Sequence, residues 1–140
     1  MRPIARNAYV VLAWLFVAGL VTQVFLAGLG VFSNATSFAT HRDFGYMLEI
    51  FPVLLLLVGL VAGLGRRMAL IAVGIFGLFI LQSVFVALRS SAPSLAALHP
   101  VNGFLILLVA LYVARAARLH RSGPVPGSER AAPNWPGGGG

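Results

Sequence analysis

Met68-Ala-Leu-Ile-Ala-Val-Gly-Ile-Phe-Gly-Leu-Phe-Ile-Leu81 is an uninterrupted run of apolar residues, and it decides the fold class. Charged residues make up only 9% of the chain, whereas they are about a quarter of a soluble domain. A helix needs roughly 20 mostly apolar residues to cross a hydrocarbon core. Such stretches lack the alternation of barrel strands, so the sequence predicts an all-α membrane protein. The four predicted spans cover about 7–32, 37–64, 67–88 and 94–118.

The predicted spans form two similar halves. Gln23-Val-Phe-Leu-Ala-Gly-Leu resembles Gln82-Ser-Val-Phe-Val-Ala-Leu, and the glutamines are followed at nearly the same separation by His41 and His99. We therefore predict two parallel helical-hairpin repeats, related by an axis along the membrane normal. Short connections favour an up-down-up-down four-helix bundle, in which spans two and four are diagonally opposite.

Arginines give the chain its formal net charge of +7, and their positions indicate topology. Only Arg42 and Arg89 lie on one side of the predicted spans. Because cytoplasmic loops are enriched in Arg and Lys, we expect a cell-membrane protein with both termini in the cytoplasm. The arginines would then face anionic lipid, and no nucleic acid partner is expected. The arginines on the other side are Arg2, Arg6, Arg66, Arg67, Arg115, Arg118, Arg121 and Arg130.

The end of the chain differs in composition from the spans. From Ser122 onward it consists mainly of Gly, Pro and isolated polar residues. Such a segment has too little apolar surface to form a packed core. We therefore predict a disordered cytoplasmic tail over 119–140.

His41 and His99 are the candidate site. Each is followed one helical turn later by a glycine, Gly45 or Gly103. Two imidazoles from diagonally opposite helices can bind a heme iron between them, and glycine leaves the backbone open to a flat ring. We predict His41 and His99 as the axial ligands of heme b on the outer side. A cofactor-free histidine pair that hydrogen-bonds across a helix interface is one alternative, and another metal or substrate site is a second.

Four polar residues are candidates for the surroundings of this cofactor. Gln23 and Gln82 can hydrogen-bond to the heme edge or to the second ring nitrogens of the histidines. Bonds across the bundle without any cofactor are the alternative. Arg42 and Arg89 can pair with the heme propionates, or they can extend to lipid headgroups instead.

Glu49 is an acidic residue within the second span. A carboxylate near the bilayer centre costs a few kcal/mol when charged, so Glu49 is expected to be protonated or paired. We consider it a possible proton site or part of a quinone pocket, with a neutral hydrogen-bonded side chain as the alternative. Pro52 and Pro100 fall inside the second and fourth spans and should bend them.

The glutamines on spans one and three, with the histidines near the outer ends of spans two and four, resemble one half of the heme A synthase family over residues 7–118. The resemblance implies that His41 and His99 bind b-type heme. Heme A synthases have two such halves, an acidic residue one turn before a histidine of the catalytic half, and often a cysteine pair in an outer loop. This chain has one half, no acid around Ser37 and no cysteine, so oxidation of a heme substrate is not implied.

The sequence motif Leu98-His-Pro-Val-Asn-Gly103 carries a second resemblance. It resembles small four-span bacterial membrane proteins of unknown function, and it implies no activity.

The predicted function is that of an electron-transfer or cofactor-holding protein rather than a stand-alone catalyst. The sequence contains no nucleophile with a supporting base, no phosphate loop and no dinucleotide fingerprint. The expected partners are the lipid bilayer and either a membrane redox protein or further copies of this chain. Two alternatives remain: a cofactor-free structural or assembly subunit of a larger membrane complex, and a small-molecule transporter that uses Glu49.

Overall fold

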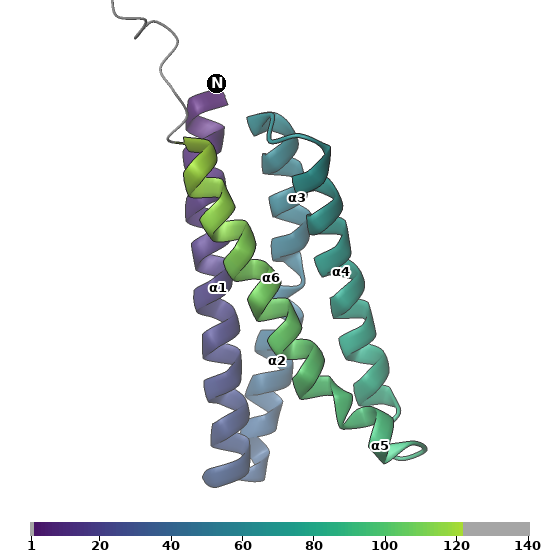
Figure 1. The fold of residues 1–140 in the computed structure, drawn as a ribbon. Helices are drawn as coiled ribbons and strands as arrows, with labels where there is room; N and C mark the ends of the chain where they lie inside the picture. Colours follow the sequence, from purple (N-terminus) through teal and green to yellow (C-terminus); the bar gives the residue numbers. More distant parts are fainter. Residues whose placement is uncertain (1, 122–140) are drawn as a thin grey trace, which may run out of the picture.

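The structure is a computed structural model that describes residues 2–121, and it confirms the all-α fold class (Figure 1). The predicted tail lies outside the described residues from residue 122 onward, whereas residues 119–121 continue the last helix. The elements are α1 (Arg2–Phe32), the 3-10 turn η1 (Ala35–Ser37), α2 (Phe38–Leu48), α3 (Ile50–Ala62), α4 (Arg66–Ala87), α5 (Pro93–Ala96) and α6 (Leu98–Arg121).

Four parts of the chain are long and apolar enough to cross a membrane: Arg2–Phe32, Ala35–Ala62, Arg66–Ala87 and Pro93–Leu119. They match the four predicted spans, and they indicate a multi-pass integral membrane protein in a lipid bilayer. The first helix begins at Arg2 rather than near Asn7. Hydropathy marks the apolar part of a helix, and α1 continues beyond it into its charged first turns.

The helices are arranged as a square in the described part of the chain. The backbone of α1 runs close to those of α3 and α6, and the backbone of α4 also runs close to those of α3 and α6. The backbones of α1 and α4 do not approach each other in this way, and neither do those of α3 and α6. Spans two and four are therefore diagonally opposite, as predicted. The start of α1, the α3–α4 turn and the end of α6 lie at one end of the bundle, and η1 and α5 lie at the other (Figure 1). We call these the arginine end and the histidine end.

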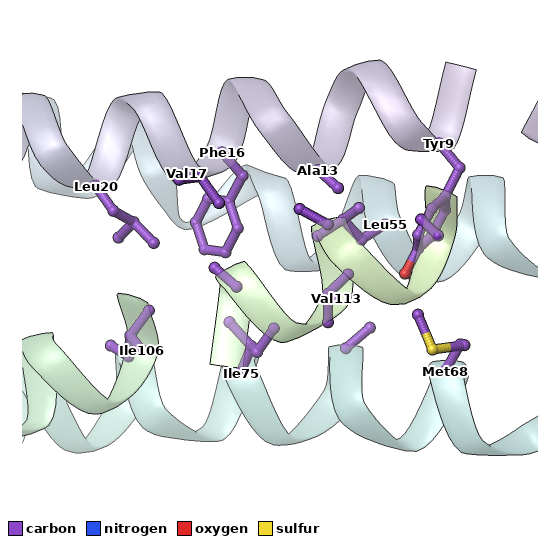
Figure 2. Close-up of a cluster of buried hydrophobic side chains, with 14 of the residues drawn as sticks. Tyr9, Ala13, Phe16, Val17, Leu20, Leu55, Met68, Ile75, Ile106 and Val113 are labelled. Atoms are coloured by element: carbon purple, nitrogen blue, oxygen red, sulfur yellow. The ribbon is translucent and has the colours of Figure 1, made fainter. Parts of the chain in front are cut away.

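The buried core lies in the half of the bundle towards the arginine end. Figure 2 shows side chains of α1, α3, α4 and α6 that meet there. Phe16 stacks on Phe51 with ring centroids 5.4 Å apart. Burial of large apolar groups in this half gives close van der Waals packing between the helices. The largest fully buried side chains are Tyr9, Phe16, Pro52, Leu55, Ile75, Ile106 and Val113.

The half towards the histidine end has almost no buried residues. In the described chain, Gly30 is the one buried position between residues 21 and 47, and no residue between 80 and 101 is buried. The backbone of helix α2 comes close to that of α1 but not to that of α4 or α6. The two hairpins are therefore tightly packed at one end and loosely packed at the other.

Two prolines interrupt the second and fourth spans, as expected. Pro52 has no backbone N–H to donate to Leu48, one helical turn earlier, and the helix is broken at Glu49 between α2 and α3. Pro100 similarly follows the break at Ala97 between α5 and α6.

The turn between the hairpins depends on two glycines with positive φ. Gly63 has φ of 67° and Gly65 has φ of 84°, which are conformations that other residues adopt only with strain. Arg6 Nε donates a hydrogen bond to the carbonyl oxygen of Ala62 at 3.3 Å. This bond satisfies one of the carbonyls that the end of α3 leaves without a partner.

Candidate functional site

The structure brings the rings of His41 and His99 together. Their centroids are 6.2 Å apart and their planes are inclined by 69°. His41 lies on α2 and His99 at the start of α6, so the two rings come from the diagonally opposite spans. Both side chains are half-buried, and the ring of Phe38 lies edge-on to His41 at a centroid distance of 6.3 Å.

Gln23 holds His41 through both its backbone and its side chain. The Nδ1 atom of His41 is 3.1 Å from the carbonyl oxygen of Gln23. A carbonyl can only accept, so Nδ1 carries the proton and Nε2 keeps its lone pair. The Gln23 amide nitrogen donates to the carbonyl oxygen of His41 at 2.7 Å and lies 3.5 Å from Nε2. A contact of 3.5 Å is too long for a strong hydrogen bond, so Nε2 is only loosely engaged.

The second hairpin repeats this arrangement. The Nδ1 atom of His99 is 3.4 Å from the carbonyl oxygen of Gln82, and its Nε2 atom is 3.4 Å from the Gln82 amide nitrogen. Each histidine is thus oriented by the glutamine of the preceding span. The repeated pattern of glutamine and histidine in the sequence corresponds to a repeated set of contacts in space.

Asn102 distinguishes the second hairpin from the first. Its side-chain nitrogen donates to the carbonyl oxygen of Leu78 at 2.9 Å and to Oε1 of Gln82 at 2.5 Å. Asn102 was not predicted as a site residue from the sequence, although it lies in the same short motif as His99. Its signal was a polar side chain one turn after a histidine, on the face that points inward.

In the first hairpin, Phe44 occupies the position that corresponds to Asn102, three residues after the histidine. A phenyl ring donates no hydrogen bond of this kind, and Oε1 of Gln23 is buried without a hydrogen-bond partner in the described residues. The rings of the two histidines therefore have similar contacts, but Gln23 also donates to the backbone of His41, whereas Gln82 instead accepts from Asn102.

The two glycines face the glutamines. A Cβ atom added to Gly45 would lie 2.8 Å from the amide nitrogen of Gln23, and one added to Gly103 would lie 3.4 Å from that of Gln82. Their small size therefore makes room for a side-chain amide next to each histidine. The predicted contact of these glycines with a cofactor stays a prediction.

The two arginines at the histidine end differ in their charge partners. Arg42 Nε is 2.9 Å from Oδ1 of Asp43, and both side chains are exposed. Arg89 donates to the carbonyl oxygen of Val86 at 3.4 Å and makes no ion pair within the described residues. The charge of Arg42 is thus already balanced by its neighbour in the chain, whereas that of Arg89 is not.

Glu49 lies apart from the histidine pair, at the break between α2 and α3. It is half-buried, and its side chain makes no hydrogen bond or ion pair within the described residues. It lines a cleft of about 370 Å³ whose other wall is α4.

Within residues 2–121, no group of three or more His, Cys, Asp or Glu side chains is placed to hold a metal ion. Structural zinc sites use four protein ligands, and catalytic ones use three. A heme iron needs at most two from the protein, because the porphyrin supplies the others. The two histidines match the second requirement.

Residues 23–88 match the model of a family of unknown function, DUF6220. The matched region begins at Gln23, includes His41 and Glu49, and ends beyond Gln82. No curated protein and no solved structure matches the chain. The similarity to DUF6220 agrees with the expected resemblance to a family of unknown function, and none of the comparisons bears on the resemblance to heme A synthases.

Proposed function

We propose that this integral membrane protein binds one b-type heme between His41 and His99 and acts as an electron-transfer or cofactor-holding protein. The observation that carries the proposal is the 6.2 Å separation of the two ring centroids. A metal–imidazole bond is about 2.0–2.1 Å long, so two rings on opposite sides of one metal ion have centroids about 6 Å apart. The rings therefore need little change in separation to share an iron.

The protonation of the rings also fits axial ligation. Metal-bound histidines commonly donate their other ring N–H to a carbonyl or carboxylate, which fixes the tautomer and the ring orientation. His41 and His99 both have Nδ1 next to a backbone carbonyl oxygen, at 3.1 and 3.4 Å. Each Nε2 atom is 3.4–3.5 Å from a glutamine amide nitrogen, and it could bind a metal once that amide turned away from the ring.

The loose packing at the histidine end supports the proposal as well. A porphyrin is a large flat apolar group, and it needs side chains that are not already packed against one another. Positions that face inward there, among them Gln23, Phe44 and Gln82, are half-buried rather than buried. They would surround the cofactor and exclude water from it.

A heme held by His41 and His99 would supply one-electron transfer at this site. The chain itself would hold the rings, through Gln23 and Gln82, and offer a positive charge for the propionates. Arg89 is the better placed of the two arginines for that role, because Arg42 is already paired with Asp43. By the positive-inside rule, we also propose that the arginine end faces the cytoplasm of the cell and the histidine end faces outward.

The proposal is tested by the visible spectrum of the protein purified in detergent and supplied with hemin. We expect a Soret band and the low-spin bands of bis-histidine heme. The double variant His41→Ala, His99→Ala should lose them. The matched control is His120→Ala, which removes the remaining histidine of the chain and should leave the spectrum unchanged. No Soret band in the wild type, or an unchanged band in the double variant, would contradict the proposal.

A second function, that of a cofactor-free subunit of a larger membrane complex, is favoured by the outer surface of α4. Gly74 and Gly77 are exposed, and a Cβ atom at either would meet nothing within 4 Å. Small residues allow close approach of another membrane helix. A colourless protein that purifies with a stoichiometric partner, and that loses the partner on Gly77→Leu substitution, would support this function instead.

A further inference from the structure

The carboxyl group of Glu49 has no hydrogen-bond or ion-pair partner within the described residues. It lies at the middle of the spanning stretch Ala35–Ala62, where a charged carboxylate costs a few kcal/mol. Acidic side chains at this depth usually pair with another polar group of the protein. Glu49 has no such partner in the described residues, so the structure leaves a hydrogen-bonding group available for something else.

The surroundings of Glu49 form a cleft rather than a packed interface. The cleft has a volume of about 370 Å³, within the range of small-molecule sites, roughly 300–1,000 Å³. One side is Glu49, and the other is a face of α4. The lining residues on α4 are Phe76, Phe79, Ile80, Ser83, Val84 and Ala87.

The cleft lies where the second span separates from α4. Helix α3 packs against α4, but the backbone of α2, beyond the break, does not come close to that of α4. Five of the six lining residues on α4 are exposed, all except Phe79, so the cleft opens on the surface that faces the lipid. A ligand can therefore enter from the bilayer without separating the helices.

The position and lining restrict the class of ligand. Ions and lipid headgroups stay near the membrane surface, because moving them to the bilayer centre is costly. The ligand must therefore be soluble in lipid and must carry a polar atom for Glu49. Phe76 and Phe79 offer two aromatic rings, which favour an aromatic ligand by offset or edge-to-face packing.

We propose that this cleft binds a lipid-soluble phenol, the chemical class that includes the membrane hydroquinones, with its ring near Phe76 and Phe79 and its hydroxyl hydrogen-bonded to Glu49. The carboxyl group can accept from the hydroxyl when it is ionised and donate to it when it is protonated. The cleft shares no residue with the histidine pair, so the proposal does not depend on bound heme.

The test is equilibrium binding of radiolabelled decyl-benzohydroquinone to the full-length protein in lipid nanodiscs, under anaerobic conditions. We expect saturable binding above the partition into empty nanodiscs. Glu49→Leu should weaken it about tenfold, the effect of losing one hydrogen bond to an ionisable group. Glu49→Gln keeps a hydrogen-bonding side chain of similar size and should bind within about threefold of the wild type.

A second pair of variants tests the location without changing Glu49. Ala87→Phe fills the cleft and should abolish saturable binding. Val73→Phe adds a similar group on an exposed position of α4 outside the cleft and should have no effect. An excess of decanol, which has a hydroxyl but no ring, should not displace the probe.

Several outcomes would overturn the proposal: no saturable binding to the wild type, unchanged binding in both Glu49→Leu and Ala87→Phe, or full displacement by decanol. The heme-site double variant His41→Ala, His99→Ala should bind the probe as the wild type does. The Soret band, recorded on the same preparations, tests the heme site separately, so failure of one proposal is distinguishable from failure of the other.

Discussion

Asn102 donates a hydrogen bond to Oε1 of Gln82 at 2.5 Å, and Phe44 occupies the corresponding position in the other hairpin. Asn102 is also the one buried polar residue in the described chain. Through Gln82, it fixes the amide that lies next to His99. His99 thus belongs to a network of three polar residues, whereas the polar contacts of His41 are with Gln23 alone among the described residues.

Replacing Asn102 with leucine should therefore destabilise the protein. The substitution removes two hydrogen bonds and leaves Oε1 of Gln82 without a donor. Hydrogen bonds between transmembrane helices contribute about 0.6 kcal/mol on average and up to about 1.7 kcal/mol, so we expect a loss of about 1–2 kcal/mol. The measurement is unfolding in mixed detergent micelles, followed by circular dichroism. Phe104→Leu, at an exposed position of the same helix, is the control, and an equal loss in both variants would argue against the network.

The two site glycines should respond differently to alanine. In Gly45→Ala the new Cβ atom would lie 2.8 Å from the Gln23 amide nitrogen, so the amide must leave its bond to His41. In Gly103→Ala the distance is 3.4 Å, which a small shift relieves. We expect the ring ¹⁵N resonances of His41 to move strongly in the first variant, and those of His99 only slightly in the second.

Gly77→Ala controls for the general effect of alanine in a helix. Nothing lies within 4 Å of the added Cβ atom, so this variant should be neutral or more stable, by up to about 1 kcal/mol from helix propensity. Equal shifts of the His41 resonances in Gly45→Ala and Gly77→Ala would show that the contact with Gln23 is not their cause.

Pro52→Ala should close the helix break at Glu49. Alanine restores a backbone N–H that can donate to the carbonyl oxygen of Leu48, and it removes the clash of the proline ring. We expect slower hydrogen–deuterium exchange across residues 48–53. Pro93→Ala provides the comparison, because Pro93 is the first residue of α5, where a backbone N–H has no partner in the helix. Unchanged exchange around Glu49 would mean that packing of α2, and not Pro52, causes the break.

The orientation in the membrane can be tested directly, because the chain has no cysteine. Ile4→Cys marks the arginine end and Ser91→Cys the histidine end, and both positions are exposed. In sealed right-side-out vesicles, a membrane-impermeant maleimide should label Ser91→Cys at once and Ile4→Cys only after permeabilisation. The reverse pattern would place the histidine pair on the cytoplasmic side.

Hydropathy and the internal repeat were enough to predict the four spans and the diagonal placement of spans two and four. The same repeat placed the glutamines and histidines near the same ends of neighbouring spans, and hydrogen bonds between them were one of the predicted possibilities. Periodicity does not specify side-chain rotamers or backbone acceptors. It therefore could not show that the Gln23 carbonyl receives the proton of His41, or that Asn102 completes the network around Gln82.

The two site glycines show a second kind of information that the sequence does not contain. A glycine one turn after a histidine indicates a close approach, but the sequence does not say what approaches. In the structure the neighbour of Gly45 is the amide of Gln23, which belongs to the chain itself. The role of Glu49 was equally open, because its lack of a partner depends on how α2 departs from α4.

The unequal packing of the two ends bears on the order of events during biogenesis. Most of the large buried side chains lie in the middle of the bundle and towards the arginine end, and few of them come from the region around the histidines. Membrane insertion and helix association can therefore be completed before any ligand binds near the histidines. Evolutionary change around His41 and His99 can then alter what the protein carries while leaving intact its ability to assemble.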